Sequence, residues 1–221
     1  DGKILLITRP TPAGHPVVVA ANLAVSLAQS GLAVTLVAAD PAGIQPSALL
    51  DVPNEPGLTD VVRDGLALAC AVHACSVAGL AVLPGGSTDS DRGSLLGNGT
   101  IGTVLSTVAA RADVVIVVAP AILSGAITGL LAESADLAVL VVDAARTTRR
   151  AVAAAAAQLE PLRPTLIGCV LDNVGRPRKP PPRTTTTSEP DAHRQLELEI
   201  PKVGENDRRI RPTALSMKGI R

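Results

Sequence analysis

A loop in the position of a phosphate-binding site lies near the amino terminus. The apolar run Ile4–Ile7 predicts a strand, and the Ala/Val/Leu-rich run from Val17 to Gly31 predicts a helix. Backbone N–H groups in a loop that joins a strand to a helix, together with the helix N-terminus, suit an anion such as phosphate. The signature for that task is GxxxxGK[ST], with a lysine for the phosphates and a hydroxyl for Mg²⁺. The loop lacks this signature.

A second group of residues could bind a metal ion: Cys70, His73 and Cys75, which lie within six residues. No second pair of ligands with zinc-site spacing follows them. The favoured interpretation is therefore buried small apolar cysteines and a surface histidine, with no metal site. The chain has three cysteines, and so small and odd a number fits a reducing compartment better than a disulfide framework.

Residues around the loop keep the spacing of a known loop. Thr8, Pro12 and the run Ala-Ala-Asn-Leu-Ala at 20–24 match, without a gap, a T-S-x-x-P-G-E-G-K-S-T loop followed by A-A-N-L-A. This pattern resembles the deviant P-loop ATPases related to septum-site and plasmid-partition proteins. Within them it is most similar to the cytoplasmic kinase domain of the bacterial tyrosine kinases that regulate capsule and exopolysaccharide export. The resemblance extends over about residues 3–174.

In the register of that family, the groups that hold the nucleotide are replaced. After Gly14, His15 stands in the place of the last glycine, Pro16 in that of the lysine, and Val17 and Val18 in those of the two hydroxyl residues. The lysine charge is lost, proline removes a backbone donor, and valine cannot bind a metal. Losing several contacts worth about 1.5–3 kcal/mol each weakens ATP binding by orders of magnitude. The alternative that His15 replaces the lysine as the cation stays open.

The resemblance implies further losses in the metal site. The family's D-x-D after the second strand becomes Ala38 and Asp40, so one carboxylate of the two remains. A lone Asp40 is more simply a helix or turn cap than a catalytic group. The family's D-x-P-P aspartate, which holds the metal through water, corresponds to Val118. The asparagine that contacts adenine corresponds to Asp172, with Asn173 one place later, which leaves base recognition open.

The segment 52–65, VPNEPGLTDVVRDG, is the closest local match to the kinase family. Six of its residues agree with the family segment P-N-x-x-G-L-x-D-x-L-x-G: Pro53, Asn54, Gly57, Leu58, Asp60 and Gly65. The pattern predicts a turn and then an amphipathic helical turn that begins near Thr59. This segment separates the kinases from the septum-site and plasmid-partition relatives.

Strand and helix patterns alternate along the first four-fifths of the chain. Strands are predicted at 33–37, 80–83, 113–120, 137–142 and 165–171, and helices at 100–111 and 148–159. Asp89–Leu96 stands where the family often shows N-P-x-E-L-L. This alternation predicts an α/β fold with a doubly wound, mostly parallel sheet flanked by helices in three layers, as in P-loop NTPases.

Composition changes abruptly at Gly175. Residues 1–172 carry a formal charge of −5 and residues 173–221 carry +5. We therefore expect two parts, a degenerate P-loop NTPase-like domain at 1–174 and a Pro/Thr/basic linker with a polar, largely disordered tail at 175–221. Thr184–Ser188 could accept phosphate from another kinase, although a low-complexity linker is the default interpretation. The chain has no tyrosine, and so lacks the family's C-terminal autophosphorylation cluster.

These replacements predict a catalytically inactive relative of the exopolysaccharide tyrosine kinases, with a regulatory or scaffolding role in cell-surface polysaccharide biosynthesis or export. No cofactor is expected. Two alternatives remain: a weak or unconventional ATP-binding ATPase or kinase that acts in trans and needs Mg·ATP, or a positioning protein of the septum-site or partition type. A lipid-binding helix of the latter type is not evident in the sequence.

The same resemblance implies partners and a place in the cell. We expect a protein partner in a polysaccharide export or co-polymerase complex, either an active homologue or a further copy of this chain, and no nucleic acid. No apolar run is long enough to span a bilayer. The expected location is cytoplasmic, at the cytoplasmic face of the inner membrane, and membrane-spanning segments before Asp1 in a longer parent chain stay possible.

Overall fold

A computed structural model of the chain describes residues 2–40, 43–87, 100–162 and 164–174. Its strands are β1 Lys3–Thr8, β2 Val34–Ala38, β3 His73–Ala74, β4 Leu80–Leu83, β5 Val114–Val118, β6 Leu137–Asp143 and β7 Thr165–Asp172. Its helices are α1 Pro16–Gln29, α2 Ser47–Leu50, α3 Leu58–Asp64, α4 Leu68–Ala71, α5 Thr100–Ala109, α6 Ile127–Glu133 and α7 Arg149–Leu159, with a 3₁₀ turn at Ile122–Ser124.

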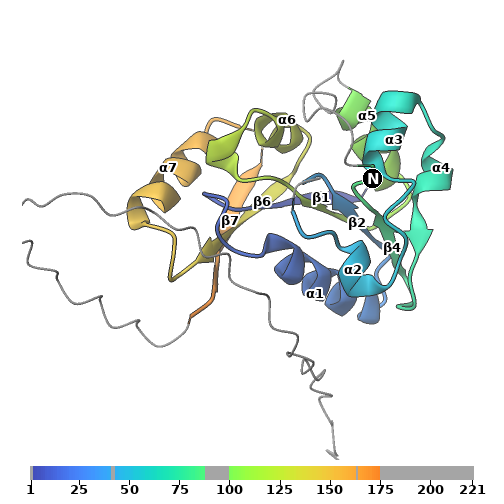
Figure 1. Cartoon of the computed structure of the whole chain (residues 1–221), viewed down its shortest axis with the longest axis horizontal. Helices are drawn as coiled ribbons and strands as arrows, with labels where there is room; N and C mark the ends of the chain where they lie inside the picture. The colour runs from blue at the N-terminus through green and yellow to red at the C-terminus, as the bar shows by residue number, and fades with distance from the viewer. Residues whose placement is uncertain (1, 41–42, 88–99, 163, 175–221) are drawn as a thin grey trace, which may run out of the picture. The chain divides into compact units, whose positions relative to one another are not determined.

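The seven strands form one sheet in the order β3-β4-β2-β5-β1-β6-β7. Every pair is parallel except β3 with β4, which is antiparallel. Figure 1 shows α1 and α2 on one side of the sheet and α3, α5, α6 and α7 on the other. The predicted doubly wound, mostly parallel α/β sheet in three layers is therefore confirmed.

The central strands are buried on both faces because helices cover both sides. In β5 the run Val115–Val118 is buried, as four consecutive β-branched residues predict for an inner parallel strand. One core cluster joins the sheet to α1, whose buried positions are mostly alanine and valine. The other joins the opposite face to α3, α5, α6 and α7. With no aromatic residue in the chain, these small side chains bring the helices close to the sheet.

Strand order decides where a site can form. The strand β1 lies between β5 and β6, and β5 lies between β1 and β2. The carboxyl ends of the neighbouring strands β1, β2 and β5 therefore lie at the same end of the sheet. The connections that follow these strands run to opposite sides of the sheet order. In doubly wound sheets, ligands bind at such a change of direction. The loops that follow Thr8, Ala38 and Val118 converge there.

Most predicted elements are present with shifts of a few residues. The first helix ends at Gln29, and Gly31 then adopts a left-handed φ of +96°, as expected for a glycine after a helix. Sequence patterns missed the short elements α2, α4 and β3, as well as α6. The prediction for Asp89–Leu96 falls outside the described residues.

The helical turn predicted in the segment 52–65 corresponds to α3. It begins at Leu58 after Gly57, and the Asp60 carboxylate accepts a hydrogen bond of 2.7 Å from the Gly57 N–H. A Cβ at Gly57 would overlap the backbone of Pro84 and Gly86, so only glycine fits this close approach of two loops. The match to the family segment thus marks a place where α3 is fixed to the end of β4.

The chain divides into a unit at Asp1–Lys179 and a second at Pro180–Arg221. The second unit, with the predicted tail and the segment Thr184–Ser188, lies outside the described residues. Among the residues that the structure describes, no helix is long and apolar enough to cross a membrane.

Candidate functional site

The loop after β1 has the course predicted for a phosphate-binding loop. Its first anchor is Thr8, whose hydroxyl donates a hydrogen bond of 2.6 Å to the carbonyl oxygen of Pro120 at the end of β5. Gly14 then adopts a φ of +94°, which favours glycine, and α1 begins with Pro16 at its first turn. The strand, loop and helix predicted from the sequence are therefore confirmed, and Gly14 turns the chain into the helix.

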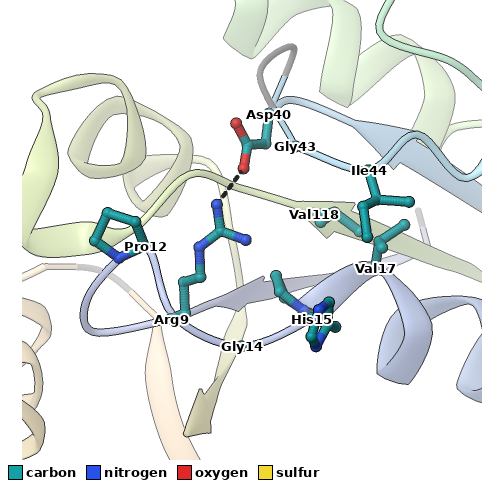
Figure 2. A pocket seen from close by; sticks show the side chains of 10 residues that line it. Arg9, Pro12, Gly14, His15, Val17, Asp40, Gly43, Ile44 and Val118 are labelled. Carbon is teal, nitrogen blue, oxygen red and sulfur yellow. Dashed lines mark hydrogen bonds and ion pairs between the residues drawn. The ribbon is translucent and has the colours of Figure 1, made fainter. Parts of the chain in front are cut away.

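A small cavity of about 230 Å³ lies at this loop, where β1, β2 and β5 end. Residues from three loops and the start of α1 line it: Arg9, Pro12, Gly14, His15, Pro16, Val17, Asp40, Gly43, Ile44 and Val118. The structure thus brings together most of the positions singled out from the sequence. Figure 2 shows them around the opening, with Val17, Ile44 and Val118 gathered near α1.

The charged groups of the cavity are paired with each other. A guanidinium nitrogen of Arg9 lies 2.8 Å from a carboxylate oxygen of Asp40, and Figure 2 shows this contact across the cavity. The side chains are only 15% and 8% exposed. Among the described lining residues, Arg9 and Asp40 are the ones with permanent charge. The cavity therefore has no net charge from these residues with which to attract a polyanion or a cation.

The role of Asp40 differs from the cap suggested by its sequence. Its carboxylate accepts from Arg9, while its backbone oxygen accepts from Gly43 and from the Gln45 amide. The sequence analysis did not single out Arg9. One signal was available: an arginine directly after β1 and a lone aspartate after β2 stand at the same edge of a parallel sheet, within reach of a long side chain.

The positions that hold metal and phosphate in the resembled family are apolar here. Val17 and Val118 are 2% and 3% exposed and line the cavity, and Ala38 is buried at the end of β2. Pro16 has no N–H to offer at the first helical position. These residues do not fit Mg²⁺ with a nucleoside triphosphate, because neither a free carboxylate nor a lysine lines the described cavity. Val18 is exposed.

The two residues at the base-contact position contact other parts of the protein. Asp172, the last residue of β7, places a carboxylate oxygen 3.5 Å from Nδ1 of His15. Asn173 has a φ of 55°, and its amide lies 3.4 Å from both carboxylate oxygens of Asp143. The His15 side chain is about half exposed and does not cap α1. His15 therefore connects the loop to the end of β7.

Asp143 is a buried carboxyl group that sequence reasoning missed. It follows β6 and accepts hydrogen bonds of 2.9 Å from the N–H groups of Ala145 and Arg146. Desolvation raises the pKa of this carboxyl, but the hydrogen bonds from Ala145, Asn173 and Arg146 and the charge of Arg146 outweigh it. The net result is a pKa of Asp143 below the ordinary value.

This shift gives a pH dependence with a definite sign. A carboxyl with a lowered pKa in the folded state stabilises the protein above its unfolded pKa, about 3.9, and loses that contribution as pH falls through the folded pKa. We expect Asp143→Asn to be less stable than wild type at pH 7, with the difference shrinking below about pH 4. Urea unfolding at several pH values measures it. Glu133→Gln, at an exposed position, is the matched control; a pH-independent difference for Asp143→Asn contradicts the argument.

The cysteine and histidine group does not form a site in the structure. His73 Nε2 lies 2.9 Å from the carbonyl oxygen of Pro56, and Cys75 contacts Val77. The predicted buried cysteines and surface histidine are wrong here, because Cys70 is exposed while Cys75 and His73 are half-buried. Within the described ranges, no cluster of three or more Cys, His, Asp or Glu side chains is placed to hold a metal ion.

Comparisons with known proteins identify relatives of the chain. No protein-family model matches the chain. The tyrosine-protein kinase YwqD of Bacillus subtilis is 30% identical over 170 residues, which are 77% of this chain and 72% of YwqD. Among solved structures, the BceF tyrosine kinase domain is 27% identical with a TM-score of 0.70, over 78% of this chain and 69% of that one.

The fold extends to a wider group. The septum site-determining protein MinD of Pyrococcus horikoshii, solved with Mg-ADP, has a TM-score of 0.67 at 22% identity, over 79% of this chain and 72% of that one. At that identity the likeness concerns the fold alone, a P-loop NTPase fold. The match to YwqD spans most of both proteins. The chain therefore belongs to the family of bacterial tyrosine-protein kinases.

Proposed function

We propose that the chain is a catalytically inactive relative of the exopolysaccharide tyrosine kinases, with a regulatory or scaffolding role in cell-surface polysaccharide biosynthesis or export. The ion pair between Arg9 and Asp40 is the observation that carries the proposal. The guanidinium and the carboxylate that line the described cavity are bound to each other. A kinase needs a free cation to bind phosphate and free carboxylates to bind the metal. Binding a nucleotide would require breaking a largely buried pair.

The apolar positions support the same proposal independently. Kinases move a phosphoryl group by positioning it and by neutralising its charge, which requires metal and cationic side chains. Pro16, Val17, Ala38 and Val118 offer neither, although the strand, loop and helix around them are present. A domain that retains the fold but not these groups keeps its surfaces for contacts with other proteins.

The proposed setting follows from the family. The partner would be a protein of a polysaccharide export or co-polymerase complex, either an active homologous kinase or another copy of this chain. The proposed location is the cytoplasmic face of the inner membrane. No cofactor is part of the proposal.

Calorimetry with the purified chain tests the proposal. We expect no saturable heat with Mg·ATP or Mg·ADP at concentrations up to about 1 mM, which corresponds to a dissociation constant weaker than about 1 mM. A variant with a rebuilt loop, described in the Discussion, is the matched comparison, and far-UV circular dichroism of both samples controls for the fold. Binding of Mg·ATP by wild type at micromolar strength would overturn the proposal.

A weak ATP-binding protein that acts in trans is the second candidate, favoured by the position of His15 on the cavity wall. In that case His15 supplies the missing cation when protonated, and Asp40 must leave Arg9 to assist a metal. Measured ATP hydrolysis that falls by at least about tenfold in His15→Ala and in Asp40→Asn would support it. Hydrolysis unchanged in both variants rules it out.

A further inference from the structure

The two edges of the sheet are very different. At one edge, β3 is a two-residue antiparallel strand, which is too short to template a further strand. At the other edge, β7 has eight residues and pairs only with β6 within the described part of the chain. Figure 1 shows β7 at this border, with α7 beside it. An edge strand of this length presents a row of N–H and C=O groups that can pair with another strand.

The composition of β7 does not protect this edge. Thr165–Leu171 contains no charged residue and no proline, two of the features that blunt an exposed edge. The one charge of the strand is Asp172 at its end, and its one irregularity is the register shift opposite Ala138 and Val139. Large apolar side chains are exposed along it, namely Ile167 at 57%, Leu171 at 60% and, just beyond the strand, Val174 at 72%. An apolar border of this kind on a folded domain indicates a contact surface.

A bulge places two leucines on the same face. Leu166 pairs with Ala138 and Leu171 with Val142, and both partners belong to the core cluster on the α7 side of the sheet. The register shift after Ala138 makes this possible, because residues five apart in a regular strand face opposite sides. Leu171 therefore projects on the α7 side, near the carboxyl end of β7.

A groove with a mixed polar and apolar lining opens on that same side at the other end of the strand. It has a volume of about 720 Å³ and is lined by Ala153, Ala156, Ala157, Glu160, Leu162, Pro164, Thr165 and Leu166. Small alanines of α7 form one wall, and the start of β7 forms the other. One face of β7 thus carries an exposed leucine at one end and a hollow at the other.

We propose that this border is an interface between two copies of the chain, with the two β7 strands antiparallel about a two-fold axis. A two-fold axis exchanges the ends of the strand, so Leu171 of each copy meets the groove of the other. An isologous contact requires that one surface carry both complementary features, and β7 does so. This self-complementarity favours a second copy over an unrelated strand. The proposal is independent of whether the cavity binds nucleotide.

Charges at the ends of α7 fit the same arrangement. Arg149 and Arg150 lie exposed at its first turn, and Glu160 follows its last residue. Antiparallel strands place the amino end of one α7 on the side of the carboxyl end of the other. Opposite charges then face each other at both ends of the interface, where parallel strands would bring like charges together.

Oligomeric mass as a function of concentration is the first test. Analytical ultracentrifugation of the full chain is expected to show a reversible monomer–dimer equilibrium. Leu171→Lys, which puts the charge typical of protected edges on the strand, should weaken the dimer by at least about tenfold. Leu49→Lys on α2 is the matched control, an exposed leucine outside the border, and should leave the equilibrium unchanged. A wild-type chain that is monomeric at all concentrations overturns the proposal.

The native cysteine in β7 gives a second readout. Cys169 is exposed near the middle of the strand, so the two-fold axis brings the two copies of Cys169 close together. A short bis-maleimide should cross-link wild type but not Cys169→Ser, and Leu171→Lys should reduce the yield. A dimer that persists in Leu171→Lys with no cross-link through Cys169 would place the interface elsewhere. If the hydrogen-exchange protection of β7 does not depend on protein concentration, another segment of the same chain covers the strand. That result also overturns the proposal.

Discussion

Replacing Arg9 with methionine is expected to lower the free energy of unfolding by about 3–5 kcal/mol, because it leaves the Asp40 carboxylate buried without its partner. The two side chains are 15% and 8% exposed, and their charged atoms lie 2.8 Å apart. Breaking a pair at this depth costs far more than breaking one at the surface. Urea unfolding at pH 7 measures the change.

The double variant Arg9→Met with Asp40→Leu distinguishes the contribution of the charge pair to stability from the contribution of side-chain packing. When both charges are removed together, the desolvation of two ions disappears along with their attraction, so the double variant is expected within about 1–2 kcal/mol of wild type. If the double variant is as unstable as Arg9→Met alone, packing and not the charge pair explains the loss. This outcome would remove the main support for the proposal that the Arg9–Asp40 pair cancels the charge of the cavity.

A surface pair provides the matched control. Lys3 lies 3.5 Å from Asp136, but the lysine side chain is 72% exposed. Lys3→Met is therefore expected to change the free energy of unfolding by less than about 1 kcal/mol, and the change should shrink further with added salt. Arg9→Met should keep its effect at high salt, because a buried pair is screened much less.

The sequence predicted the sheet well because inner parallel strands carry a strong local signal. The strand β5 appears as an uninterrupted β-branched run, and the loop before α1 keeps the spacing of its family. Short elements carry no such signal. Helices of four residues such as α2 and α4 span little more than one turn, so no periodicity can develop, and their formation depends on tertiary packing.

The site was predicted in its positions but not in its contacts. Pro16, Val17 and Val118 meet at the cavity because strand order brings their loops together, and the family register already specified that order. The pair of Arg9 with Asp40 depends on side-chain direction across the intervening β5, which no local pattern records. The same applies to Asp143, whose partners include Asn173 in a segment 30 residues away.

Restoring the family residues of the loop should restore ATP binding. This is the largest gain in affinity that we expect from any variant. The variant carries His15→Gly, Pro16→Lys, Val17→Ser and Val18→Thr, which restores the last glycine, the lysine and the two hydroxyl residues of the family loop. Each regained contact to a charged phosphate contributes about 1.5–3 kcal/mol, so affinity for ATP should rise by at least about a hundredfold. Hydrolysis should stay absent, because Ala38 and Val118 still supply no carboxylate for the metal.

Two controls make the rebuilt loop decisive. Val18→Lys adds the same charge to an exposed position beside the cavity and should not raise the affinity for ATP, which separates a positioned lysine from general attraction. Combining the rebuilt loop with Arg9→Met tests whether the ion pair also limits binding, since its removal frees space beside Asp40. If the folded variant shows no gain, the four loop residues are not what prevents binding. The combined variant then decides whether the Arg9–Asp40 pair prevents binding, because only its removal would in that case raise the affinity for ATP.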